Sequence, residues 1–200
     1  TENGRILDTE ETAMKTALYE IASTGKANFR FTCQQKLIVS DILPEDKNMV
    51  EEVLGRYGLL AHTEKAGTLR KNAIACVALN TCPLALAEGQ RYLPSLISKL
   101  EPILEKYGLT EEEMSIRMTG CPNGCGRPYA CEIGLIGTAA GRYNLHLGGD
   151  RAGERLNLKY RENLDEEAIL HTLDQLWGRF SAERNPGENF GDFCIRVQIV

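Results

Sequence analysis

Four of the seven cysteines form two close pairs with the chemistry of a metal centre. Five residues separate Cys76 from Cys82, and three separate Cys121 from Cys125. The second pair lies in TGCPNGCGRP, where proline lacks an amide donor and Asn-Gly favours a turn, so this segment is neither helix nor regular strand. Four thiolates are the usual ligands of tetrahedral zinc or of an iron-sulfur cluster.

The spacing of the pairs helps to choose between these metals. Zinc ribbons usually present two C-x2-C knuckles, and neither pair has that spacing. The wider, unequal spacing favours a cluster, while a zinc site and structural thiols remain open alternatives. A cluster needs cover from water, which apolar and small neighbours would supply; these are Leu79, Leu84, Gly120, Gly124 and Gly126.

The other three cysteines, Cys33, Cys131 and Cys194, stand apart from these pairs. An odd number of cysteines in a chain without an export signal argues against a disulfide framework. We therefore expect all three to be buried thiols without chemical function.

Composition narrows the class of protein. The chain has 200 residues, of which 42% are hydrophobic, enough to form a core. Its net charge of -5 argues against binding to nucleic acid or to an anionic membrane. No apolar run approaches the roughly 18 residues of a membrane span, and the start TENGRILDTEET is unlike a signal peptide, so we expect a cytoplasmic protein. The first residue, Thr1, suggests processing or excision from a longer chain.

The first part of the chain has the pattern of a small α+β layer. A helix is predicted from Thr9, as its N-cap, to about Thr24, with Gly25 as its stop. Strands are predicted around 29–32 and 37–42, and a second helix from Pro44 to Gly58. Residues 62–70 lack periodicity, which predicts a boundary between domains at 1–68 and 69–200.

The second part alternates between strands and helices. Two or three helical pieces are expected between residues 80 and 108, because Pro94 and Pro102 interrupt the pattern. A further helix is predicted at 165–184, and strands at 72–79, 114–120, 133–137, 142–147 and 193–200. Each cysteine pair then lies at the end of a strand, where loops can bring distant ligands together.

Three motifs in the same order, TCPLA, TGCPNGCGRP and GRYNLHLGGD, resemble the C-terminal half of the assimilatory sulfite reductase hemoproteins, and the resemblance spans the chain. It implies an α+β fold, with a small ferredoxin-like module at 1–68 and a mixed-sheet domain at 69–200. It also implies a 4Fe-4S cluster on Cys76, Cys82, Cys121 and Cys125. The last of these would bridge to the iron of a sirohaem, with Gly124 and Gly126 leaving room for the macrocycle.

The resemblance further implies an activity, the reduction of sulfite to sulfide, with electrons from a flavoprotein partner in the NADPH-dependent form. The N-terminal half of the family protein supplies most of the basic residues that hold sirohaem and sulfite, so this fragment should be inactive alone. Sirohaem nitrite reductases share the cysteine frame, although CPNGCGRP and YNLHLGG are more similar to the sulfite branch. A nitrite reductase, a non-catalytic iron-sulfur electron carrier and a zinc module are the alternatives.

A few polar residues near the motifs are candidate cofactor contacts. Arg127 and Arg142, like Arg117, flank the cysteine and glycine segments and could pair with sirohaem carboxylates, although a surface role suits them equally. Asn123 could donate from its amide toward the cofactor. His146 should point away from the neighbouring leucines, toward solvent or a hydrogen-bond partner. Hydrolase and nucleotide-binding motifs are absent from the sequence.

Overall fold

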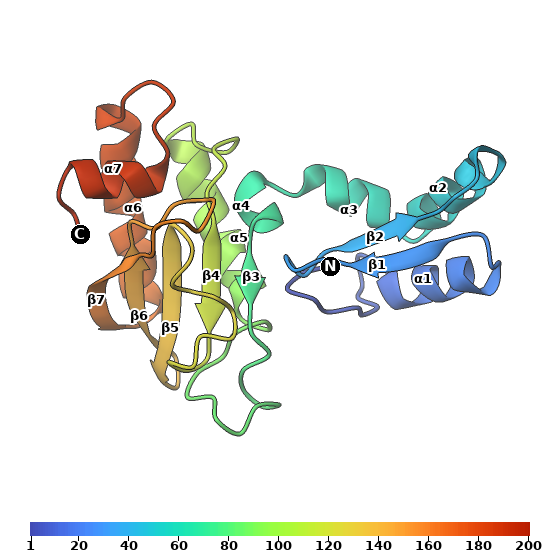
Figure 1. The fold of residues 1–200 in the computed structure, drawn as a ribbon, viewed down its shortest axis with the longest axis horizontal. Helices are drawn as coiled ribbons and strands as arrows, with labels where there is room; N and C mark the ends of the chain where they lie inside the picture. Colours follow the sequence, from blue (N-terminus) through green and yellow to red (C-terminus); the bar gives the residue numbers. More distant parts are fainter. The chain divides into compact units, whose positions relative to one another are not determined.

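The computed structural model describes residues 1–200 and divides into two compact units, Thr1–Ala66 and Gly67–Val200 (Figure 1). The boundary expected at residue 68 falls at the first residue of α4, Thr68–Lys71. None of the helices combines the length and the apolar composition that a membrane-spanning helix requires.

The first unit packs helices against a two-stranded antiparallel sheet. In that sheet Asn28 pairs with Ser40 and Phe31 with Leu37. Its small core consists of Ala17, Ile21, Val50, Val53 and Leu59. Its elements are α1 (Met14–Ser23), β1 (Asn28–Phe31), β2 (Leu37–Ser40), η1 (Pro44–Asp46), α2 (Lys47–Arg56) and α3 (Leu59–Lys65).

Three predictions in this unit need correction. Helix α1 begins at Met14, because the Thr9 hydroxyl accepts the amide of Thr12 in a turn that precedes the helix. The region around His62 is not irregular but forms α3, since Gly58 at φ +76° ends α2 and lets the chain turn directly into another helix. Cys33 is exposed in the turn between β1 and β2, and so is not a core residue.

The second unit is built on a five-stranded mixed sheet in the order β3-β4-β5-β6-β7. The first three strands run parallel, and the pairs β5-β6 and β6-β7 are antiparallel. This architecture confirms the predicted α+β class with a mixed sheet. The strands are β3 (Ile74–Ala75), β4 (Ile116–Thr119), β5 (Ile133–Ala139), β6 (Arg142–Leu147) and β7 (Leu158–Leu164).

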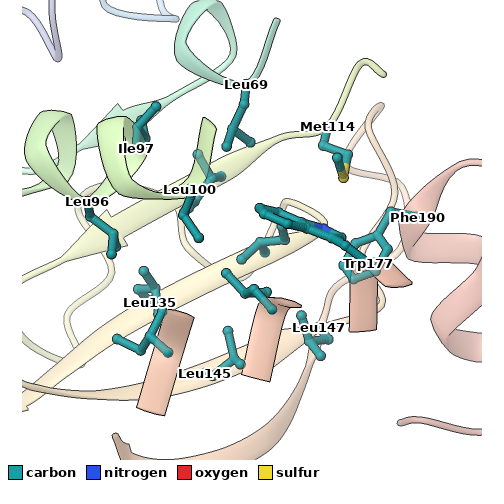
Figure 2. Packing of buried hydrophobic residues seen from close by; sticks show 14 of the residues in the cluster. Leu69, Leu96, Ile97, Leu100, Met114, Leu135, Leu145, Leu147, Trp177 and Phe190 are labelled. Atoms are coloured by element: carbon teal, nitrogen blue, oxygen red, sulfur yellow. The ribbon is translucent and has the colours of Figure 1, made fainter. Parts of the chain in front are cut away.

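Helices cover one face of this sheet and enclose the main core. Figure 2 shows Leu96 and Leu100 of α5 (Leu93–Lys106) facing Leu135 of β5 and Leu145 of β6. Trp177 of α6 (Glu166–Glu183), which is fully buried, lies in the same layer. The alternation along β6 therefore directs Leu145 and Leu147 toward the helices and His146 toward the opposite face.

Three predictions in this unit also need correction, and one strand was not predicted. Helix α5 is a single helix, with Pro94 in its first turn and Pro102 inside it. The expected strand at 72–79 is reduced to β3, and β7 was not expected, because its mostly exposed edge shows little apolar alternation. The strand predicted at 193–200 is wrong, because residues 193–196 belong to α7 (Phe190–Arg196) and residues 197–200 form a turn and an irregular end. Asn189 caps this helix, and Phe190, Phe193 and Cys194 are buried on one of its faces.

Candidate metal centre

The two cysteine pairs follow adjacent parallel strands. Because β3 and β4 are parallel, with Ala75 opposite Met118, their carboxyl ends meet at the same edge of the sheet. The amide of Cys76 donates to the carbonyl of Met118 at 3.1 Å, which extends this pairing by one residue. In Figure 1 the segments that follow the two strands leave the sheet at the same end. The pairing thus places Cys76 beside the start of TGCPNGCGRP.

The loop that carries Cys82 folds back onto this start. The amides of Leu86 and Ala87 both donate to the carbonyl of Gly120, at 2.8 and 3.0 Å. Within the loop, the amide of Cys82 donates to the carbonyl of Ala78 at 2.8 Å. The loop is therefore fixed to the residue that directly precedes Cys121.

The segment after Cys125 packs against the other two segments, because Gly126 lies directly against the ends of β3 and β4. A Cβ atom at position 126 would lie 2.3 Å from the carbonyl oxygen of Met118 and 3.1 Å from the amide nitrogen of Cys76. Gly126 is thus glycine because the protein backbone passes there, a reason different from the room for a macrocycle that the resemblance implied. Three backbone segments, which together carry all four cysteines, are in mutual contact.

The four thiols differ in exposure. Cys121 is buried, Cys76 and Cys82 are half-buried, and Cys125 is exposed; none is in a disulfide. No three His, Cys, Asp or Glu side chains are grouped so as to hold a metal ion. The structure therefore brings the thiols to one edge of the sheet without drawing their sulfur atoms to a single point.

Two hydrogen-bond donors contact the sulfur of Cys76. The amide of Gly120 lies 3.2 Å from Sγ, and the hydroxyl of Thr119 lies 3.4 Å from it. Gly120 also has no room for a side chain, since a Cβ atom there would lie 2.6 Å from the carbonyl oxygen of Ala87.

Buried polar side chains on the far face of the sheet hold the chain that follows Cys125. Asn157, which is 5% exposed, donates through Nδ2 to the carbonyls of Pro128 at 2.6 Å and Cys131 at 2.9 Å. Arg117 is also buried, and its Nη1 donates to the carbonyl of Arg127 at 3.4 Å. The sequence alone does not single out Asn157, because nothing in its local pattern distinguishes it from a loop asparagine.

His146 is buried, not directed to solvent. Its ring lies edge-to-face with Tyr129, with the centroids 5.5 Å apart. Burial lowers the pKa of His146, and the charge of Lys159 lowers it further, so the ring is neutral at pH 7. The Tyr129 hydroxyl donates to the carbonyl of Pro122 at 3.4 Å, which links His146 to the turn between Cys121 and Cys125. Tyr129 was not singled out from the sequence.

The three predicted cofactor contacts lie in different environments. Asn123 and Arg127 are exposed on either side of Cys125, and Arg127 has a positive φ of 53°. Arg142 is exposed at the start of β6, and its Nη1 pairs with Oδ2 of Asp165 at 3.0 Å. Its guanidinium group thus has an acidic partner within the unit.

Two of the remaining thiols behave as expected for core residues. Cys131 and Cys194 are fully buried, and burial raises the pKa of each to about 12. Neither is a thiolate at neutral pH, so neither has the reactivity of a ligand or a nucleophile.

A solved structure shares the fold of this chain. The NirA protein of Mycobacterium tuberculosis shares the fold with a TM-score of 0.72 and 26% identity, over 90% of this chain and 35% of that one. No family model matches the sequence.

Curated relatives define the family more closely. Sulfite reductase (NADPH) hemoprotein beta-components from Leptospira biflexa, Afipia carboxidovorans and Staphylococcus carnosus are 59%, 56% and 49% identical over 199 residues. This chain is thus homologous, along its whole length, to a segment of the sulfite reductase hemoproteins, which confirms the resemblance seen in its motifs. It spans about a third of those proteins, covering 36%, 34% and 35% of their lengths.

Proposed function

We propose that this chain is the cluster-carrying part of a sulfite reductase hemoprotein. In this proposal Cys76, Cys82, Cys121 and Cys125 hold a 4Fe-4S cluster, and Cys125 also bonds to the iron of a sirohaem. The observation that carries it is the contact among three backbone segments at the carboxyl ends of β3 and β4. That contact brings residues as distant as Cys76 and Cys125 to one edge of the sheet.

The residues present fit such a group in chemistry and in exposure. Four thiols outside any disulfide form the donor set that iron-sulfur clusters take. The Gly120 amide, already within hydrogen-bond distance of the Cys76 sulfur, is the type of donor that stabilises a ligating thiolate. When bound, the cluster and sirohaem supply the electron transfer that converts sulfite into sulfide.

Each cysteine has a role that follows from its exposure. Buried Cys121 and half-buried Cys76 and Cys82 serve the cluster alone, since protein surrounds their side chains. Cys125 is the exposed one of the four and can reach a second group outside the sheet. Asn123 and Arg127 are exposed beside it, and in this proposal they donate to sirohaem carboxylates. Arg142 can do so only after it leaves Asp165.

Cluster reconstitution tests the ligand set. The chain is analysed for zinc as purified, treated anaerobically with ferrous iron and sulfide, and then analysed for iron, acid-labile sulfide and visible absorption. We expect about four of each per chain, as a 4Fe-4S cluster requires. Serine at Cys76, Cys82 or Cys121 should lower the yield, whereas Cys33→Ser, which changes an exposed thiol elsewhere, should not. One zinc per chain without visible absorption would instead establish the zinc module.

The bridge is tested in the intact protein. Cys125→Ser should abolish sulfite reduction and disturb the sirohaem spectrum even where iron and sulfide are retained. Normal sirohaem coupling in this variant would move the bridge to another residue.

The proposal also covers the substrate and the partner of the whole protein. The relatives are named as NADPH sulfite reductase components, which supports sulfite as substrate and a flavoprotein as the route for electrons from NADPH. About two thirds of the relatives' length lies outside this chain, so the chain alone should not reduce sulfite even with sirohaem supplied. Sulfide release by the chain with a chemical reductant would contradict this. Parallel assays of the intact protein with sulfite and nitrite separate sulfite reductase from nitrite reductase.

A further inference from the structure

Thr119, the last residue of β4, places its hydroxyl against the sulfur of Cys76. The side chain is fully buried, and its hydrogen bond runs to Cys76 Sγ at 3.4 Å. The contact follows from the topology, because parallel pairing of β3 with β4 sets Cys76 opposite Thr119. A buried hydroxyl requires an acceptor, and here that acceptor is a candidate cluster ligand.

A second donor fixes the same sulfur. The amide of Gly120 lies 3.2 Å from Sγ, and the carbonyl of Gly120 is held by the amides of Leu86 and Ala87. The backbone that carries both donors is thus fixed on each side, by the sheet before Thr119 and by the cysteine loop after Gly120. The two donors therefore hold their positions relative to the sulfur.

We propose that Thr119 is a positioning residue that orients the Cys76 thiolate and raises the reduction potential of the cluster; this rests on the proposed function above. A hydrogen bond from a neutral donor offsets negative charge on a thiolate ligand. The reduced cluster carries one more negative charge than the oxidised cluster, so the bond stabilises the reduced form more. Hydrogen bonds to cluster sulfurs are among the factors that set such potentials.

The test uses the full chain with reconstituted cluster and two matched substitutions. Thr119→Val keeps the shape of the side chain and removes the donor, whereas Thr119→Ser keeps the donor and removes a methyl group. The cluster's midpoint potential is measured by anaerobic redox titration, and iron and sulfide are counted in each sample. We expect equal cluster content, a more negative midpoint for the valine variant, and a midpoint for the serine variant close to that of the wild type.

Each outcome is decisive. A valine variant with the wild-type midpoint overturns the proposal, as does an equal shift in both variants, which would trace the effect to packing. If the wild-type chain takes up no iron and sulfide, the proposed function fails and this inference fails with it. A cluster that forms without the valine shift refutes the role of Thr119 alone.

Discussion

Single glycines set the geometry of the candidate centre because they lie where backbones cross. At position 126 the nearest neighbours of an added Cβ are main-chain atoms of Met118 and Cys76, which no rotamer change can move. The same holds at position 120 against the carbonyl of Ala87. The arrangement of cysteines thus depends on the absence of side chains as much as on the thiols.

Gly126→Ala should therefore destabilise the second unit and reduce cluster uptake. We expect a loss of about 3 kcal/mol in the free energy of unfolding, at the upper end for overpacking, because backbone must shift. Urea unfolding followed by the fluorescence of Trp177 would measure it. Gly67→Ala is the matched control, since position 67 lies in the same unit, has a φ of -65°, and its nearest contact, a carboxylate oxygen of Glu101, is 3.7 Å away. An unchanged urea midpoint for Gly126→Ala would contradict the close approach of the backbone segments at position 126.

An ion pair near the carboxyl end provides a residue-scale test with a defined pH dependence. The hydrogen bonds from Arg196 lower the pKa of Glu188 from 4.5 to about 2. A carboxyl group with a lowered pKa stabilises the fold above its unfolded pKa, and this contribution is lost as the pH falls through the folded pKa. The stability difference between wild type and Glu188→Gln should therefore be constant above about pH 5 and shrink between about pH 4.5 and 2. Thermal unfolding across this range would show it, and a difference independent of pH would argue against the pairing.

At the scale of elements, the carboxylate of Asp165 both caps helix α6 and pairs with Arg142. Oδ1 of Asp165 accepts the amide of Ala168 at 3.0 Å, and Oδ2 pairs with Arg142. The first contact caps the helix, and the second holds an arginine that the sequence singled out as a cofactor contact. The helix that covers the sheet and the side chain of that arginine are thus linked.

Asp165→Ala should remove the cap, at a cost of about 1 kcal/mol in unfolding free energy. Asp165→Asn is the control, because asparagine caps a helix about as well but carries no charge to hold Arg142. We expect most of the stability loss in the alanine variant and little in the asparagine variant, measured by urea unfolding. Equal losses in the two variants would show that the ion pair, not the cap, stabilises α6.

At the scale of the whole molecule, each unit has a hydrophobic core of its own. The core of the second unit extends from Leu69 to Cys194, and that of the first unit lies between Ala17 and Leu59. The first unit has 66 residues and only five buried apolar side chains in its core cluster, which makes it the weaker of the two.

The units should therefore unfold in two steps. The single tryptophan, Trp177, lies in the second unit, so its fluorescence reports that unit, whereas far-ultraviolet circular dichroism reports both. In urea we expect part of the dichroism to be lost before the fluorescence changes. Coincident transitions by the two probes would show that the units unfold together.

The local sequence determined the elements whose signals are short in range. The helix at 165–184 follows a helical apolar pattern, and β4 lies in the alternating segment MSIRMTG. Gly25 ends α1 at φ +67°, as its lack of a side chain allows. The cysteine motifs identified both the family and the candidate ligands, because residue type and spacing are properties of sequence alone. Their shared role as ligands stays a prediction.

Only the tertiary structure decided which residues meet. The parallel pairing of β3 with β4 brings Cys76 to Thr119, Gly120 and Gly126, although more than forty positions separate them in sequence. The same long-range packing placed residues 193–196, the first half of FCIRVQIV, in helix α7 and left residues 197–200 outside any strand, because Phe193 and Cys194 are buried on one face of that helix. It also left Cys33 exposed in a turn. Local propensities amount to tenths of a kcal/mol per residue and burial of a large side chain to a few kcal/mol, so contacts distant in sequence determine the final positions.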